Sequence, residues 1–185
     1  MNIPGIMETS PTQSHRSNMI KRMIGASKLD PDVYEEVEAD SSATRQAMAV
    51  VVLVALATGI GMFGTGGLVG LVVGIPVSIC LWALWALITY LVGTTIFKTS
   101  ETEANWGQLA RTLGFAQSPG ILKALGFIPG IGLLIFSIAS IWQLVAMVIA
   151  VRQALEFTST WRAIGVVIVG FIPYALISSS ILALL

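Results

Sequence analysis

The chain has 185 residues, of which 55 % are hydrophobic and only 11 % are charged. Soluble domains carry about 25 % charged residues, so this composition excludes an ordinary soluble domain and indicates an integral membrane protein. The 10 basic and 10 acidic residues balance to a net charge of zero, but they are segregated along the chain, and all except Lys123 fall outside the long apolar blocks.

The N-terminal region begins with a polar segment. Residues 1–18 are rich in Pro, Ser, Thr and Asn and have no apolar period, which predicts a disordered tail because such a segment buries too little apolar surface to offset the entropy of ordering it. Residues 19–28 instead separate apolar from basic side chains on a helix. Two interpretations stay open: a short helix in the headgroup region, or a cytosolic helix packed on the rest of the protein. The apolar residues are Met19, Ile20, Met23 and Ile24, and the basic ones are Lys21, Arg22 and Lys28.

A second short helix is predicted to begin at Asp30. Asp is a favoured N-cap residue, Pro31 suits the first helical position, and the acids that follow suit the positive end of the helix dipole. Val33 and Val37 lie one turn apart, so this acidic helix has one apolar edge. Residues 19–46 are therefore expected to form amphipathic and acidic helices on the cytosolic side.

The rest of the chain, 47–185, is predicted to form an all-α membrane domain. No charged residue occurs from Gln46 to Phe97, a length that fits two crossings of about 20 residues joined by a turn at Gly64–Gly67. The run from Thr112 to Val151 has a similar length, with a turn at Pro129 and Gly130 and a single charge. Five spans follow, over about 47–63, 68–97, 112–128, 131–151 and 163–185.

Whether the third predicted span, 112–128, crosses the membrane is judged from the positions of the cationic residues. With five crossings, the basic residues of the N-terminal region and of the second and fourth links all lie on one side, while the links at Gly64–Gly67 and near Pro129 carry no charge. With four crossings, Arg152 and Arg162 would lie outside. The positive-inside rule therefore favours five spans, with the N-terminus in the cytoplasm and the C-terminus outside.

The third span is also predicted to be short, kinked or broken. Ser118, Pro119 and Gly120 interrupt its middle, and Lys123 is costly in hydrocarbon unless it reaches the interface. One interpretation is a transport or lipid site at Ser118, Pro119, Gly120 and Lys123, because half-helix ends in membranes bind ions and anionic groups. The other interpretation is a kinked helix in a compact bundle.

Small and polar residues in the spans predict helix packing. Gly66, Gly70 and Gly74 recur every four positions, a spacing that lets helices approach closely. Gln143, beside Trp142, is expected to hydrogen-bond to another helix because an unpaired amide in lipid costs several kcal/mol. These five residues are the candidate packing or partner contacts.

Catalytic chemistry has almost no residues to use. The only histidine is His15, and no predicted span contains Asp, Glu or His. The acids between Glu35 and Asp40 lack the spacing of a metal-binding loop. We therefore expect no enzyme activity, no catalytic or metal-binding residues and no cofactor.

Four stretches resemble bacterial members of the Yip1 domain family of multi-pass membrane proteins. They read "LDPDVYEEVEADSSATRQA", "GFAQSPGILKALGFIPGIGLLI", "IWQLVAMVIAVRQAL" and "TSTWRAIGVVIVGFI", and the likeness extends from about Ala26 to Ile177. Its most specific part is the pattern at Pro119, Trp142, Gln143 and Arg152. The resemblance implies a bundle of about five spans with a cytosolic N-terminus. Eukaryotic relatives are associated with Rab GTPases, but their Asp-Leu-Tyr-Gly-Pro element is absent, so GTPase binding is not carried over.

Three functional hypotheses remain. The first is a non-enzymatic scaffold, assembly factor or accessory subunit of the bacterial cytoplasmic membrane, with lipids, further copies of the chain or other membrane subunits as partners and no nucleic acid. The second is a small transporter or channel that uses the broken third span. The third is a lipid-binding or membrane-organising protein in which the basic stretch from Lys21 to Lys28 contacts anionic headgroups.

Overall fold

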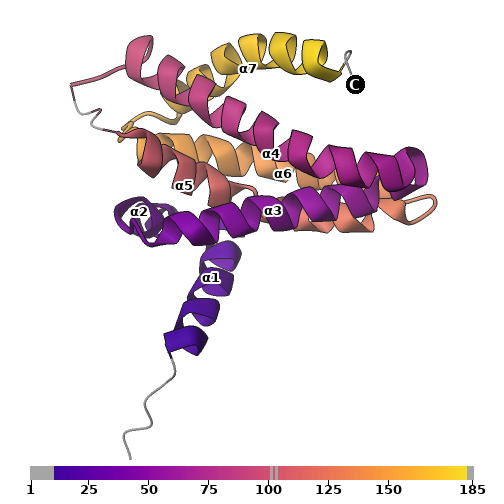
Figure 1. Cartoon of the computed structure of the whole chain (residues 1–185). Helices are drawn as coiled ribbons and strands as arrows, with labels where there is room; N and C mark the ends of the chain where they lie inside the picture. Colours follow the sequence, from indigo (N-terminus) through magenta and orange to yellow (C-terminus); the bar gives the residue numbers. More distant parts are fainter. Residues whose placement is uncertain (1–10, 101, 103, 183–185) are drawn as a thin grey trace, which may run out of the picture.

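The protein is a bundle of helices (Figure 1). The computed structural model describes residues 11–100, 102 and 104–182, and every regular element within them is helical. The all-α prediction is therefore confirmed for this part of the chain, while the first ten residues of the expected disordered tail lie outside it.

Two short helices precede the bundle. The first, α1 (Pro11–Ser27), begins earlier than expected and includes the last eight residues of the segment 1–18, which the sequence predicted to be disordered. Pro11 has a backbone suited to a helix start. The second, α2 (Pro31–Ala39), begins as predicted: the side chain of Asp30 accepts a hydrogen bond from the backbone N–H of Asp32 at 3.2 Å. We refer to α1 and α2 together as the N-terminal cap.

Four helices of the described residues are long and apolar enough to cross a membrane. They are α3 (Ala43–Gly61), the part Leu71–Thr95 of α4 (Phe63–Thr95), α6 (Gly132–Ala154), and the part Thr160–Ser180 of α7 (Thr160–Leu182). These match the first, second, fourth and fifth predicted spans. Their outward faces carry exposed apolar side chains, which suits contact with lipid.

The link between α3 and α4 is tighter than the sequence suggested. The first helix ends at Gly61 and the next begins at Phe63, so Met62 makes the turn. Gly67, with φ of 56° and ψ of −156°, then interrupts α4 in a region that only glycine adopts readily. The turn predicted at Gly64–Gly67 therefore lies at Met62 instead, and Gly67 interrupts the first part of α4.

The predicted third span, 112–128, is not a single α-helix. It is divided between α5 (Trp106–Ala116) and a 3₁₀-helix, η1 (Ser118–Phe127), and neither is among the four membrane-length helices. Pro119 causes the change, because it lacks the N–H of a regular α-helical turn and stands at the start of η1. The count of five spans is therefore not confirmed by helix length.

The α5–η1 segment nevertheless runs beside α3 in the same direction. A Cβ atom added to Gly114 would lie 2.9 Å from Ala47, and one added to Gly120 would lie 2.7 Å from Val54. At the far end, the backbone of Gly126 meets that of Gly61. The contacts advance together along both chains, so the segment follows α3 from near its start to its end.

Large buried side chains gather where the cap meets the bundle. Tyr34 of α2, Leu109 and Phe115 of α5 and Leu155 after α6 are fully buried. Further along, small residues such as Ala146 line the helix contacts instead. The best-packed core therefore lies at the cap end of the bundle, and this core positions the site described next.

Candidate functional site: the N-terminal cap and the polar contacts beneath it

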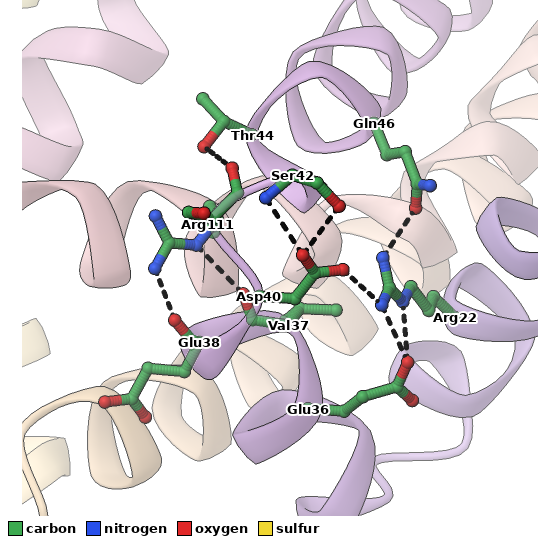
Figure 2. A network of polar contacts seen from close by, with 10 residues as sticks. Arg22, Glu36, Val37, Glu38, Asp40, Ser42, Thr44, Gln46 and Arg111 are labelled. Carbon is green, nitrogen blue, oxygen red and sulfur yellow. Dashed lines mark hydrogen bonds and ion pairs between the residues drawn. The ribbon is translucent and has the colours of Figure 1, made fainter. Parts of the chain in front are cut away.

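Arg22 joins three helices at the base of the cap (Figure 2). Its side chain is only 4 % exposed. Nε and Nη2 donate to Glu36 Oε1 at 2.9 and 2.8 Å, and Nη2 also donates to Asp40 Oδ2 at 2.6 Å. Nη1 donates to Gln46 Oε1 on α3 at 2.9 Å. A buried guanidinium is stable only when its donors are satisfied in this way, so Arg22 fixes how α1, α2 and α3 meet.

The electrostatics of this cluster follow from the same contacts. Burial alone would lower the pKa of Arg22, but hydrogen bonds to Asp40 and Glu36 outweigh it and raise that pKa. Hydrogen bonds from Ser42 and Arg22 lower the pKa of Asp40 to about 2. Both groups therefore stay charged throughout the neutral range, and the ion pairs persist.

Arg111 holds the backbone of the same C-terminal half of α2 (Figure 2). It lies on α5, where it is buried, and its Nε donates to the backbone carbonyl of Val37 at 2.9 Å. Nη2 donates to the carbonyl of Glu38. These carbonyls are at the C-terminal end of α2, where a cation also interacts favourably with the helix dipole. The C-terminal half of the short acidic helix is thus held by two arginines from outside it, Arg22 through side chains and Arg111 through backbone carbonyls.

Three further hydrogen bonds stabilise the cap, one within it and two that attach it to the bundle. Within the cap, Tyr34 donates from its buried hydroxyl to the carbonyl of Ala26 at 3.0 Å. Trp142 of α6 donates from Nε1 to the carbonyl of Ser27 at 2.8 Å, and Gln153 of α6 donates to Glu35 at 2.9 Å. Trp142, proposed from the sequence as a packing or partner contact, therefore anchors the end of α1.

Glu38 is the group of this region that titrates near neutrality. Burial raises the pKa of its carboxyl to about 7, and the nearby charges of Glu156 and Glu35 act in the same direction, while Arg111 opposes them. The junction between α2 and the end of α6 therefore contains a carboxyl whose charge changes close to physiological pH.

Gln143 makes the contact between helices that its position predicted. Its Nε2 donates to the Gln117 side-chain oxygen at 2.7 Å and to the Gln117 carbonyl at 3.2 Å. A Cβ atom on Gly120 would lie 2.3 Å from Gln143 Nε2, so only glycine fits there. The amide thus satisfies the backbone at the point where α5 passes into η1.

The proposed transport or lipid residues do not form one cluster. Ser118 and Pro119 are buried, and the Ser118 hydroxyl donates to the carbonyl of Phe115 at 2.6 Å. Lys123 lies further along η1, with its ammonium 5.0 Å from the ring centre of Phe136. The structure therefore brings Gly120 to Gln143. Lys123 lines a cavity together with Gln117 and Gln143, whereas Ser118 and Pro119 do not line it. The transport interpretation stays a prediction.

Of the three glycines predicted to form a packing stripe, only the surroundings of Gly74 are described. A Cβ atom added to Gly74 would meet nothing within 4 Å. Gly66 and Gly70 fall outside the residues whose surroundings are described. The role of these glycines in partner contacts stays a prediction.

The contacts of Arg22, Gln46 and Arg111 were not predicted from the sequence. Part of the signal was present, because Glu36 and Asp40 are spaced four residues apart and so share one face of α2. Nothing in the sequence indicated which cation would fill that face, since the partners are 14 and 18 residues away.

Comparison with known proteins gives one result. The model of the Yip1 domain family matches residues 29–180, which covers α2 and the whole bundle. No curated protein and no solved structure matches the chain. The match and the apolar helices together make this a multi-pass membrane protein. The family is not known as enzymatic, and the described residues contain no group of His, Cys, Asp or Glu side chains that could hold a metal ion. The chain belongs to the Yip1 domain family.

Proposed function

We propose that the protein is a non-enzymatic scaffold, assembly factor or accessory subunit whose N-terminal cap is a preformed platform for a partner. The observation that carries this proposal is the attachment of the C-terminal half of α2 from two other helices, by Arg22 of α1 and by Arg111 of α5. A helix of nine residues is not stable alone in water. Its attachment to the bundle therefore sets its position, and a preformed surface loses less conformational entropy on binding a partner.

The free face of this platform is acidic. Asp32, Glu35 and Glu36 are exposed on α2. Glu35 also accepts a hydrogen bond from Gln153, and Glu36 also pairs with Arg22. Arg111 and Val37 lie on the opposite, buried side. The complementary partner is a protein or membrane subunit with a basic surface, which would be steered towards the cap by charge.

The platform faces the cytosol if the bundle crosses the membrane five times, and the α5–η1 segment is the passage in question. The last five residues of α5 and the 10 residues of η1 together extend about 28 Å, because a 3₁₀-helix rises about 2.0 Å per residue. That length is close to the hydrocarbon thickness of about 30 Å. Exposed apolar side chains along η1, including Ile121 and Leu125, suit contact with lipid.

The cationic residues support the same topology. Arg45 near the start of α3, Arg111 on α5, Arg152 near the end of α6 and Arg162 near the start of α7 belong to the end of the bundle that carries the cap (Figure 1). At the opposite end, the turn at Met62 and the turn at Pro129 contain no charged residue. The positive-inside rule then places the cap in the cytosol and the C-terminus outside.

Site-specific photo-cross-linking tests the platform. A photoreactive residue at Glu35 is expected to give one adduct of defined mass in intact membranes, and the adduct should disappear when Arg22→Ala releases the cap. A photoreactive residue at Leu133, which is 81 % exposed near the opposite end, is the matched control. Absence of an adduct at Glu35, or an adduct that is indifferent to Arg22→Ala, would overturn the proposal.

The lipid-binding hypothesis is a second candidate, favoured by the direction of α1. This helix projects sideways from the bundle, across the direction of the long helices (Figure 1). Its apolar residues Ile20 and Ile24 are 56 and 51 % exposed, and Lys21 lies beside them. A helix in the plane of the headgroups has this arrangement. A fluorophore at Ile24 should be quenched by brominated lipids, and an unquenched fluorophore would exclude this candidate.

A further inference from the structure

A cavity of about 320 Å³ lies inside the bundle. Five elements line it, namely α3, α4, η1, α6 and α7, and they pack in a ring: α3 on α4, α4 on α7, α7 on α6, and η1 on both α6 and α3. The volume lies at the lower end of the range of about 300–1,000 Å³ that is typical of small-molecule sites. The cavity is partly open, so it is distinct from a closed packing void.

Two hydrogen-bond donors on the cavity wall have no partner among the described residues. Trp82 and Trp85 both line it, and the indole N–H of each is buried without a partner in the described part of the chain. Trp85 is only 5 % exposed, and its ring is fixed by an edge contact with Tyr174 at 5.2 Å between ring centres. Buried donors normally have an acceptor, so two unpaired indoles on one wall indicate a missing ligand group.

Lys123 also lines the cavity, and its ammonium lies 5.0 Å from the ring centre of Phe136, which is not a lining residue. The two ion pairs found among the described residues both belong to Arg22, so Lys123 has no carboxylate partner there. The sequence offers none nearby, because no Asp or Glu occurs from residue 41 to residue 100 or from residue 104 to residue 155. An ammonium inside a membrane bundle is costly without an anion.

We propose that this cavity binds the anionic headgroup of a membrane amphiphile, with its phosphate or carboxylate oxygens accepting from Lys123 and from the indole N–H groups of Trp82 and Trp85. The remaining lining is mostly apolar, with Leu81 and Met147 among the wall residues, so it suits the first part of an acyl chain. Because the cavity is partly open, the rest of the chain can leave it towards the bilayer. This inference goes beyond the platform, since no residue of the cap lines the cavity.

The site differs from the surface of α1 in a testable way. Headgroups at α1 would meet Lys21 and Lys28 at the edge of the bundle, whereas the cavity depends on Lys123 and the two tryptophans. Substitution of α1 lysines should therefore leave the cavity site intact. A free phosphate ion satisfies the same donors, so the two sources of the anion have to be separated by experiment.

The test uses the full-length chain, purified and delipidated in mild detergent. Titration with dioleoylphosphatidylglycerol, followed by native mass spectrometry and by the thermal midpoint, is expected to show one tightly bound lipid. Lys123→Gln should weaken binding about tenfold or more, because hydrogen bonds to charged groups are the strong ones. Trp85→Phe removes one N–H together with the pyrrole part of the ring, keeps an aromatic side chain on the wall, and should weaken binding less. Lys123→Arg should retain binding, which shows that the loss is not a failure to fold.

Control substitutions and a control lipid show whether binding depends on the cavity and on a negatively charged headgroup. Lys98→Gln, at an exposed position outside the cavity, and Lys28→Gln on α1 should each keep the bound lipid. Dioleoylphosphatidylcholine should bind less tightly, because its headgroup carries no net negative charge. Equal binding by wild type and Lys123→Gln, or absence of any bound lipid, would overturn the proposal. Equal stabilisation by inorganic phosphate alone would overturn the assignment to a lipid.

Discussion

Arg22 of α1 and Gln46 of α3 are 24 residues apart, yet the guanidinium donates to the amide oxygen across 2.9 Å in a buried position. The same guanidinium pairs with Asp40, so one side chain connects the cap to the first long helix. Arg22→Ala is expected to destabilise the cap by about 2 kcal/mol, since the lost contacts are hydrogen bonds between charged groups. Hydrogen exchange should then accelerate in α2 and not in α6. Arg45→Ala, at an exposed position of α3, is the matched control and should leave exchange unchanged.

Glu38 predicts a pH dependence of stability. Its carboxyl has a pKa of about 7 in the folded protein against an ordinary value of 4.5, so the folded state binds the proton more tightly. The contribution of Glu38 to the free energy of unfolding is fully present when the pH is below 4.5, the ordinary pKa, and it is lost as the pH rises through about 7. The thermal midpoint should therefore fall between about pH 5 and pH 7, and Glu38→Gln should flatten this slope.

A contrast with Asp40 checks the sign of that effect. The pKa of Asp40 is lowered, so its contribution is present above 3.8 and is lost as the pH falls towards about 2. Asp40→Asn should therefore keep the slope between about pH 5 and pH 7. A wild-type midpoint that rises over this interval would contradict the assignment to Glu38.

Gly61 and Gly74 predict opposite effects of one methyl group. A Cβ atom on Gly61 would lie 1.9 Å from the carbonyl oxygen of Lys123, while one on Gly74 would meet nothing within 4 Å. Gly61→Ala forces the α5–η1 segment away from α3 and should cost about 1–3 kcal/mol. Gly74→Ala should stabilise its helix by up to about 1 kcal/mol. Thermal midpoints in detergent measure both, and equal midpoints would contradict the close backbone contact.

The bond between Gln143 and Gln117 predicts a coupling between α6 and the start of η1. A double-mutant cycle with Gln143→Ala and Gln117→Ala should give an interaction energy of about 0.6 kcal/mol, and no more than about 1.7 kcal/mol, as is usual for hydrogen bonds between membrane helices. Unfolding in mixed micelles measures it. Additive single substitutions would show that the two amides do not interact.

The sequence predicted those features that depend on local chemistry and on apolar length. Asp30 and Pro31 correctly predicted the start of α2, and the long uncharged apolar segments predicted the four long helices. The division of the third span into α5 and η1 was foreseen only as a kink at Pro119, because a 3₁₀-helix of 10 residues depends on neighbours such as Gly61 and Gln143. The partners of Arg22 could not be predicted for the same reason. They lie on other helices, and the spacing of residues along the chain does not indicate which helices pack together.

We propose that the chain crosses the membrane an odd number of times, so that the cap and the cationic links lie on the cytosolic side. Reporter tags placed before Met1 and after Leu185, in separate otherwise identical proteins, measure this directly through their accessibility in intact cells. The account predicts that the first tag is protected and the second is accessible. Two tags on the same side would contradict the five passages and the cytosolic platform together.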